Sequence, residues 1–190
     1  MGVDTSDQLL VKRVQRGDKA AFDVLVKKYQ HKIISLVSRY VRDISDAHDI
    51  AQEAFIKAYK ALPRFRGESA FYTWLYRIAI NTAKNALVSA DRRPPASDID
   101  ASEAEQYEGA AALKEIETPE RIMLKEEIEN TINQAILDLP DDLKSAITLR
   151  EFEGLSYEEI AVTMDCPVGT VRSRIFRARE AIDHKLADLL

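Results

Sequence analysis

The chain has 190 residues and a formal net charge of −5, long enough for one large or two small globular domains. A single cysteine and the lack of an apolar stretch of membrane length argue against a disulfide scaffold and a membrane-inserted protein. They predict a cytoplasmic protein without a signal peptide. Residues 1–90 carry 15 Lys and Arg against 9 Asp and Glu, whereas residues 91–140 carry 5 against 13. The basic block can meet phosphates although the whole chain is acidic, because salt screens charges beyond roughly 8 Å.

Apolar residues recur at helical spacing along the chain and no alternating strand pattern is evident, so the predicted fold class is all-α, with two small helical domains. We expect Asp7 to cap a short first helix that stops near Gly17. Asp18 is expected to cap a long second helix that reaches Tyr40.

The third predicted helix begins at about Asp46 and ends before Pro63. Toward its start, one side is acidic and polar, formed by Asp46, Asp49, Gln52 and Glu53. This side is a candidate docking face for a partner protein. The alternative is a solvated helix whose acids complement the helix dipole.

The fourth predicted helix runs from about Ala70 to about Ser89, after a loop that contains Phe65 and Ser69. It is rich in aromatic residues, including Tyr72 and Trp74. One side predicts a core stripe, formed by Phe71, Trp74, Leu75, Ile78 and Thr82, and a polar flank holds Thr73, Arg77, Asn81 and Lys84. Aromatic rings beside amides and cations suit single-stranded bases, which stack on the rings. Core packing is the alternative use of the same rings.

Residues 91–117 are acidic, small and polar, which predicts a linker between two bodies. An acidic segment that lies over a basic groove is the other interpretation. Thr118 and Pro119 are expected to open a further helix, and another follows from Leu139 to Glu153.

The segment from Leu155 to Arg179 predicts a helix-turn-helix. Ser156 can cap its first helix, Asp165 suits a left-handed turn residue, and Pro167 suits the first turn of the second helix. The outward side of that second helix carries groups that suit phosphates and base edges: Thr170, Arg172, Ser173, Arg174, Phe176, Arg177 and Arg179. A solvated basic helix is the alternative.

Enzyme chemistry finds little support in the sequence. Cys166 is expected to be a half-buried filler, no metal site is predicted, and no glycine-rich phosphate loop is present, so we expect no cofactor. Two other function classes are a conventional helix-turn-helix regulator of duplex DNA and an enzyme acting on nucleic acid. The first would leave the aromatic helix unused, and the second lacks an acid/base constellation.

Three segments together resemble the extracytoplasmic-function sigma factors of bacterial RNA polymerase, and within them the sigma-E, envelope-stress, branch. They are DAHDIAQEAFIKAYKAL, FRGESAFYTWLYRIAINTAKN and LSYEEIAVTMDCPVGTVRSRIFRAREAI. The resemblance covers nearly the whole chain. It implies a domain at 1–90 that binds core polymerase and the minus-10 promoter element, a linker at 91–117, and a domain at 118–190 that binds the minus-35 element. It also implies an anti-sigma partner anchored in the membrane.

By position, the resemblance assigns residues to three surfaces. The core polymerase surface would use Asp49, Gln52, Glu53 and Phe55 as contact or support residues. His48 departs from the acid that the family usually has there. The minus-10 surface would use Phe65, Ser69, Ala70, Tyr72, Trp74, Arg77, Asn81 and Lys84, with the loop at Phe65, Ser69 and Ala70 holding a flipped base. The minus-35 surface would use Thr170, Arg172, Ser173, Phe176, Arg177 and Arg179.

Overall fold

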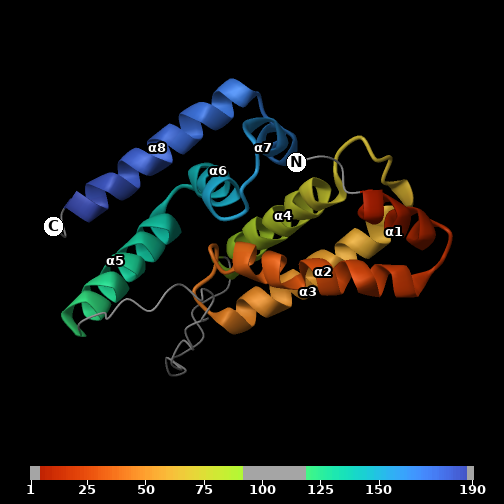
Figure 1. Cartoon of the computed structure of the whole chain (residues 1–190), viewed down its shortest axis with the longest axis horizontal. Helices are drawn as coiled ribbons and strands as arrows, with labels where there is room; N and C mark the ends of the chain where they lie inside the picture. Colours follow the sequence, from red (N-terminus) through yellow and green to blue (C-terminus); the bar gives the residue numbers. More distant parts are fainter. Residues whose placement is uncertain (1–4, 92–118, 188–190) are drawn as a thin grey trace.

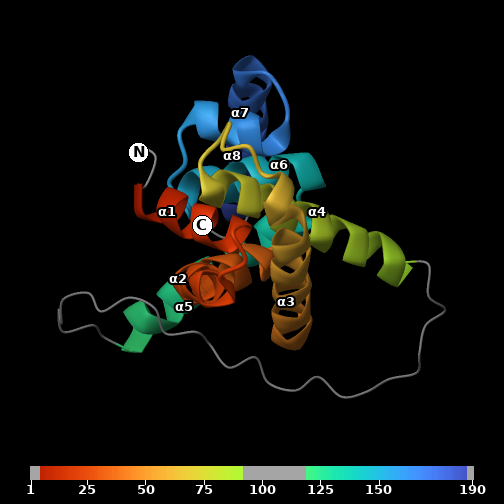
Figure 2. The ribbon, with the colours of Figure 1, turned by 90° about the vertical axis from the view of Figure 1, so that its right-hand side faces the viewer.

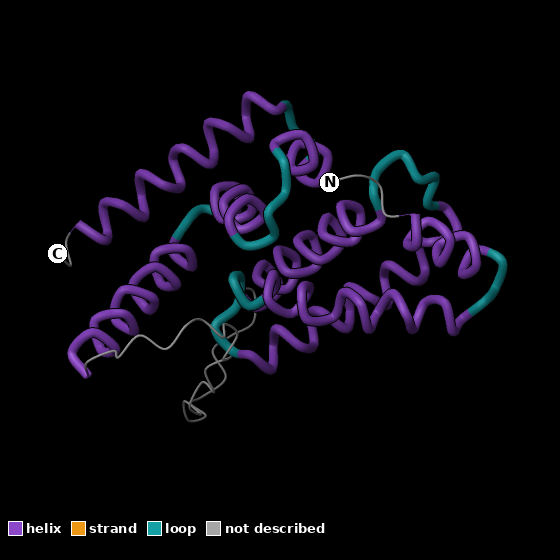
Figure 3. Tube along the Cα trace, in the orientation of Figure 1, coloured by secondary structure: helices purple, strands orange, loops and turns teal. Residues whose placement is uncertain are grey.

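The computed structural model describes residues 5–91 and 119–187 (Figure 1). Within these ranges the regular elements are helices and none is a strand (Figure 3), which confirms the all-α prediction. The elements are α1 (Thr5–Gln15), α2 (Lys19–Val37), α3 (Ile44–Ala61), the short 3-10 helix η1 (Leu62–Arg64), α4 (Phe71–Asp91), α5 (Pro119–Asp138), α6 (Asp141–Glu151), α7 (Tyr157–Met164) and α8 (Val168–Ala187).

Helices α1–α4 form the N-terminal body. In it α2 packs against α1 and α3, and α4 packs against α3 and α2. The facing sides of α3 and α4 carry fully buried alanines, among them Ala54, Ala58 and Ala79, which let the two helix backbones approach closely. Leu25, on α2, is also fully buried. The helical spacing of these apolar residues in the sequence is therefore the spacing of a core face.

Asp7 does not cap the first helix, and that prediction was wrong. It lies inside α1 with 2% of its surface exposed, accepts a hydrogen bond from the Tyr29 hydroxyl, and pairs with Lys28 at 2.7 Å. A buried carboxylate is stable only when its charge is compensated, and these partners come from the neighbouring helix α2. Asp7 thus ties α1 to α2.

The other N-terminal helix starts follow local capping. Asp18 caps α2 as predicted, accepting from the Ala21 N–H at 3.2 Å. Helix α3 begins earlier than expected, because Asp43 rather than Asp46 is its cap and accepts from the Ser45 N–H. Helix α2 ends at Val37, so Tyr40 lies beyond it, although its ring is buried in the core.

Helices α5–α8 form the C-terminal body, in which α5, α6 and α7 all pack against α8. Ser156 caps α7 as predicted, in a reciprocal capping box with Glu159. Asp165 ends α7 in the left-handed conformation, with φ of 52°, which confirms the predicted turn residue. Helix α6 is shorter at both ends than the 139–153 segment expected: Pro140 immediately precedes its start, and Phe152 is its C-cap.

The two bodies lie against each other, with α7 packed on α4 (Figures 1 and 2). One continuous cluster of buried apolar residues includes members from both bodies. The predicted linker, apart from Asp91, and Thr118 lie outside the described residues. Of the helices that the structure describes, none is long and apolar enough to cross a membrane.

Candidate nucleic-acid interface

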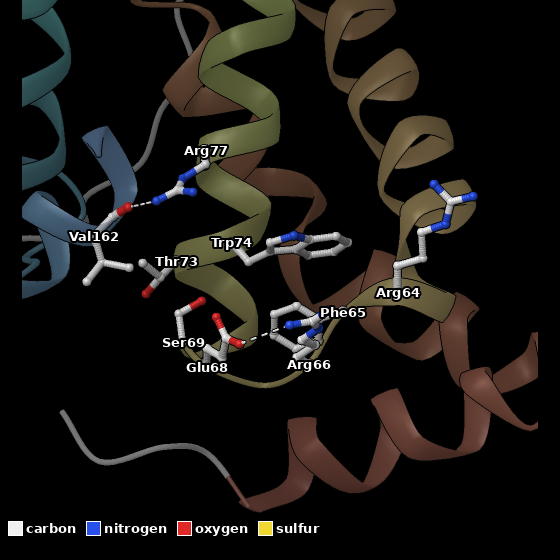
Figure 4. Close-up of a pocket in the computed structure, with 9 residues that line it drawn as sticks. All are labelled: Arg64, Phe65, Arg66, Glu68, Ser69, Thr73, Trp74, Arg77 and Val162. Carbon is white, nitrogen blue, oxygen red and sulfur yellow. Dashed lines mark hydrogen bonds and ion pairs between the residues drawn. The ribbon is translucent and has the colours of Figure 1, made fainter. Parts of the chain in front are cut away.

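A pocket of about 470 Å³ opens where the loop after η1 meets the start of α4 (Figure 4). Its walls combine aromatic rings, guanidinium groups and hydroxyls from the N-terminal body with one residue from α7. The lining residues are Arg64, Phe65, Arg66, Glu68, Ser69, Thr73, Trp74, Arg77 and Val162. Rings can stack on a base, hydroxyls can bond its edge, and arginines can pair with its phosphates, so the pocket is chemically suited to a nucleotide.

The aromatic residues divide between core and pocket. Phe71 is buried in the core with 4% exposure, whereas Phe65 and Trp74 are half-buried at the pocket wall. The Phe65 and Trp74 ring centroids are 4.8 Å apart, and Phe71 supports them from behind at 5.8 Å from Trp74. Leu75 is fully buried. The structure therefore gives part of the aromatic set to the core and leaves two rings partly open beside a pocket.

The loop that carries Phe65 is anchored to α1. The Gln15 side-chain amide donates to the carbonyl oxygens of Leu62, at 3.1 Å, and Phe65, at 2.9 Å. Gly67 has a φ of +75°, a conformation that residues with a Cβ rarely adopt. Ser69 and Ala70, both half-buried, then lead into α4. A fixed loop start and a tight glycine turn hold the Phe65 ring in place at the pocket wall.

The predicted polar flank of α4 is only partly correct. Thr73 is not on the outer surface, because it is 2% exposed and forms pocket wall, and its hydroxyl makes no hydrogen bond within the described residues. Asn81 is exposed as expected, whereas Arg77 and Lys84 are half-buried.

Four α4 side chains reach the C-terminal body. The Tyr72 hydroxyl donates to the Glu159 carboxylate, and the Tyr76 hydroxyl donates to Glu153 at 2.5 Å. The other two are cations. Arg77 donates to the carbonyl oxygens of Val162 and Thr163, the latter at 3.1 Å, and Lys84 pairs with Asp142 at 3.1 Å. Three of these side chains, Tyr72, Arg77 and Lys84, were predicted to bind DNA.

Burial and hydrogen bonding at this contact shift the pKa values of Tyr72, Glu153 and Glu159. Burial, followed by the hydrogen bond to Glu159, raises the pKa of Tyr72 to about 12. Burial also raises the pKa of Glu153, against the hydrogen bond from Tyr76. For Glu159, burial is outweighed by hydrogen bonds from Tyr72 and Ser156, so its pKa lies below the ordinary value.

Helices α7 and α8 are the two helices of the predicted helix-turn-helix, and we call α8 the recognition helix. Val171 and Ile175, both buried against the C-terminal body, hold it in place. Its opposite side is open to solvent, and Phe176 is 63% exposed. The exposed predicted residues are Arg172, Ser173, Phe176, Arg177 and Arg179, while Thr170 is half-buried. A solvent-facing phenyl ring lies between arginines here, a combination of groups that is chemically suited to a ligand with phosphates and apolar methyl groups.

Two arginines of α8 already have acidic partners. Arg174 pairs with Asp142 at 2.5 Å and donates to the Cys166 sulfur at 3.3 Å. Arg179 pairs with Glu151 at 2.5 Å in an exposed ion pair. Cys166 is half-buried, as expected of a filler.

The outer face of α3 divides the four predicted contact or support residues between these two roles. Asp49, Gln52 and Glu53 are exposed and available for contact, whereas Phe55 is 8% exposed and belongs to the core, so it can only support the face from below. Sequence reasoning missed Ile56, which is 48% exposed. Ile56 lies three residues after Glu53 and four residues after Gln52, which places it on the same helical face. This spacing could have identified Ile56 from the sequence.

In residues 5–91 and 119–187, no group of His, Cys, Asp and Glu could hold a metal ion.

The family model for Sigma-70 region 2 matches residues 25–93, and that for Sigma-70 region 4 matches residues 129–182. Over 190 residues the chain is 64% identical to the ECF RNA polymerase sigma-E factor of Escherichia coli strain K12, an alignment that covers 100% of this chain and 99% of the relative. The chain belongs to the extracytoplasmic-function (ECF) sigma factors.

The sigma factor is also 70% identical over 184 residues to the RNA polymerase sigma-H factor of Pseudomonas aeruginosa, covering 97% of this chain and 95% of that relative. Its fold is similar to that of CnrH in complex with the cytosolic domain of CnrY, with a TM-score of 0.70 at 21% identity over 96% of this chain and 98% of that one. The predicted family and sigma-E branch are thus confirmed. Sigma factors are transcription initiation factors, so the alternative of a conventional duplex regulator is not favoured.

Proposed function

We propose that this ECF sigma factor binds core RNA polymerase and both elements of its promoters through three surfaces on its two bodies. The proposed domains are residues 1–90 and 118–190, with a linker at 91–117. The end of α4 at Asp91, the start of α5 at Pro119 and the two family matches support these limits. The observation that carries the proposal is the pairing, in one chain, of an aromatic, arginine-lined pocket with a solvent-facing recognition helix.

The minus-35 surface is the outer side of α8. Arg172, Arg177 and Arg179 supply charge for phosphates or bidentate bonds to guanine, and Ser173 and Thr170 supply hydroxyls. The exposed Phe176 ring offers an apolar contact for a thymine methyl group. Because Val171 and Ile175 fix the opposite side of α8, these groups are displayed from a rigid support.

The minus-10 surface is the pocket and the adjoining outer side of α4. A base turned out of the duplex stacks on Phe65 or Trp74, with the hydroxyls of Ser69 and Thr73 at its edge. Stacking is worth about 1–3 kcal/mol per base, comparable with the cost of unstacking it, so captured bases hold the duplex open without an external energy source. Asn81, with Ala70, Tyr72, Arg77 and Lys84, serves the bases and backbone beside the pocket.

The polymerase surface is the outer face of α3, where Asp49, Gln52 and Glu53 surround Ile56. An exposed apolar residue within a polar rim is the usual composition of a protein interface.

Changing Ile56 to Asp should weaken binding to core polymerase. Ile44→Asp is the matched control, because Ile44 is equally exposed, at 47% against 48%, but lies on a different face of α3.

Regulation by an anti-sigma factor anchored in the membrane, in response to envelope stress, completes the proposal. We place the sigma factor in the cytoplasm, without cofactor and without catalytic activity of its own. The likeness of the whole chain to sigma-E factors supports the stress assignment.

Reconstituted transcription tests the proposed function. Purified sigma factor, core polymerase and a promoter library are combined, and each component is omitted in turn. The proposal expects start sites that need both proteins and share two spaced sequence elements. Sequence-specific duplex binding with no polymerase-dependent initiation would contradict it.

A further inference from the structure

Gln15, the last residue of α1, joins that helix to the loop that carries Phe65. Its Nε2 donates to the carbonyl oxygens of Leu62, at 3.1 Å, and Phe65, at 2.9 Å. An amide nitrogen carries two N–H groups, so these two bonds use both of them. The Leu62 carbonyl also accepts from the Phe65 N–H at 3.0 Å. The backbone of Phe65 is therefore held at its N–H through η1 and at its carbonyl through α1.

The loop beyond Phe65 has weak support of its own. Arg66 and Glu68 lie 4.0 Å apart with side chains that are 84% and 81% exposed, and such an ion pair contributes little to holding a loop in place. The loop next becomes regular at Ala70, whose carbonyl accepts a hydrogen bond in the first turn of α4. The Gln15 amide thus fixes one of the two ends of the loop.

Helix α1 is a rigid support for this amide. Val11 and Val14 are buried in the core. The Asp7 carboxylate, which is also buried, accepts a hydrogen bond from Tyr29 of α2. A residue that positions a binding group acts best when packing fixes its own helix. Within the described residues Gln15 is not part of the pocket wall, so it acts on a ligand through the loop.

We propose that Gln15 is a positioning residue for promoter opening, because it fixes the Phe65 ring where a captured base stacks. This inference rests on the minus-10 surface proposed above. The centre of the Phe65 ring lies 4.8 Å from that of Trp74 (Figure 4) and 6.4 Å from that of Phe71. Misplacing a positioned group by about 1 Å can lower a rate by roughly a hundredfold. Loss of the Gln15 bonds therefore lowers opening without removing any group that contacts DNA.

Gln15→Glu is the most direct test. The new side chain has nearly the same size, but a carboxylate has acceptors only and cannot donate to the two carbonyl oxygens. Gln15→Ala, which removes the amide without adding a charge, is the second variant. Gln8→Glu is the matched control, because Gln8 is exposed and lies about two turns before Gln15 on the same face of α1.

Permanganate reactivity of unpaired thymines, measured with the full chain bound to core polymerase, gives the fraction of promoter that is open. Loss of one or two hydrogen bonds predicts a fall of about three- to tenfold for Gln15→Glu, and a fall in the same direction for Gln15→Ala. Binding to upstream duplex and to core polymerase should stay unchanged in both variants. Gln8→Glu should match the unmodified protein in all three measurements.

A double-mutant cycle with Phe65 separates positioning from a merely structural role. When Gln15 acts through the Phe65 ring, Gln15→Ala lowers opening in the unmodified protein but causes no further loss in a Phe65→Ala background. Two independent effects on the fold would instead multiply. The cycle therefore measures whether the two residues act as one unit.

Trp74 supplies a second readout on the full chain without polymerase. The chain has a single tryptophan, so its fluorescence reports on the ring pair at the pocket. Gln15→Glu should increase the quenching of this fluorescence by acrylamide, as Phe65→Ala should, because the Phe65 ring no longer covers the indole. Gln8→Glu should leave the quenching unchanged.

Three results would overturn the positioning role of Gln15: full opening by Gln15→Glu, losses that multiply in the cycle, or unchanged Trp74 quenching in Gln15→Glu. Full opening by Phe65→Ala would instead show that the minus-10 pocket itself is wrongly assigned, and would remove the positioning role with it. Thermal unfolding followed by circular dichroism confirms that each variant is folded.

Discussion

The two proposed DNA surfaces differ in how their side chains are engaged. On α8, Arg172, Phe176 and Arg177 face solvent from a helix fixed by its buried side. On α4, Arg77 and its neighbours already hold partners from the other body. The upstream element is read as intact duplex, which a rigid helix can enter directly, whereas the minus-10 strand must first be unpaired. The exposed surface on α8 is thus the one whose ligand, duplex DNA, is present before the promoter is unpaired.

The largest expected effect comes from removing a ring at the pocket. Phe65→Ala should cost about 1–3 kcal/mol of base stacking and reduce promoter opening, while binding to upstream duplex stays unchanged. Permanganate reactivity of unpaired thymines measures the opening. Phe65→Tyr, which keeps a stacking ring, should restore it. Equal opening with alanine and tyrosine would show that this ring holds no base.

Two arginines of α8, the exposed Arg172 and the acid-paired Arg174, are expected to differ in how much they contribute to duplex binding. Arg172→Ala should weaken upstream duplex binding by about 1–3 kcal/mol if the side chain contacts a base, or lower the salt dependence of binding if it contacts phosphate. Arg174→Ala should have the smaller effect on duplex, because Arg174 is engaged by Asp142. Titration of duplex at several salt concentrations compares the two. A larger loss for Arg174 would reverse the assignment of the outer side of α8.

Asn81→Ala tests the exposed end of the minus-10 surface. Loss of one hydrogen bond predicts a deficit of about 0.5–1.5 kcal/mol in promoter opening, with upstream binding preserved. Permanganate footprinting and duplex titration on the same promoter separate the two steps. An unchanged melted region would remove Asn81 from the minus-10 surface.

The smallest expected effect is a pH dependence of the contact between α4 and the C-terminal body. Because burial at this contact raises its pKa, Glu153 binds a proton more tightly there than when it is exposed. Its contribution to holding the two bodies together is complete below the ordinary value of 4.5 and is lost as the pH rises through the raised value. Glu159 has the opposite sign, but its lowered pKa places that effect below 4.5.

Raising the pH from 4.5 through the raised pKa of Glu153 should therefore weaken the contact between α4 and the C-terminal body and lengthen the distance between the two bodies. Electron spin resonance between nitroxide labels at the exposed sites Asp23→Cys and Glu180→Cys, in a Cys166→Ala background, measures this distance. The groups that face Glu153 are Tyr76, Lys32 and Arg39. Glu153→Gln, which keeps an acceptor for Tyr76 without the titration, should abolish the trend. Glu158→Gln, which changes an exposed acid away from the contact with α4, should retain it. A trend that persists in Glu153→Gln would assign the titration to another group.

Features set by local chemistry could be predicted from the sequence. The caps at Asp18 and Ser156 and the left-handed turn at Asp165 depend on neighbours within a few residues, and all three are found. Asp7 has the same capping chemistry but was misplaced, because Tyr29 and Lys28 on another helix bind its carboxylate. Competition between a local and a tertiary partner is not visible in a sequence read one segment at a time.

The candidate surfaces were predicted as sets but not residue by residue. Helical spacing alone could not separate Phe55, which is buried, from Ile56, which is exposed, since the side of α3 that faces α4 depends on packing. Thr73 lies beside Arg77 in the pocket wall, as the polar flank predicted, but its burial could not be predicted for the same reason. The contacts between α4 and the C-terminal body join residues that are 58 positions apart, for Lys84 and Asp142, to 87 positions apart, for Tyr72 and Glu159, and no periodicity in the sequence indicates such a contact.

Asp142 pairs with Lys84 of α4 and with Arg174 of the recognition helix at the same time. If a promoter draws Arg174 toward its upstream element, the Asp142 carboxylate loses one of its two cations and its interaction with Lys84 changes. The two DNA elements are then linked thermodynamically, and the factor by which either one changes affinity for the other must be the same in both directions. One carboxylate in the first turn of α6 would make promoter recognition cooperative within a single chain.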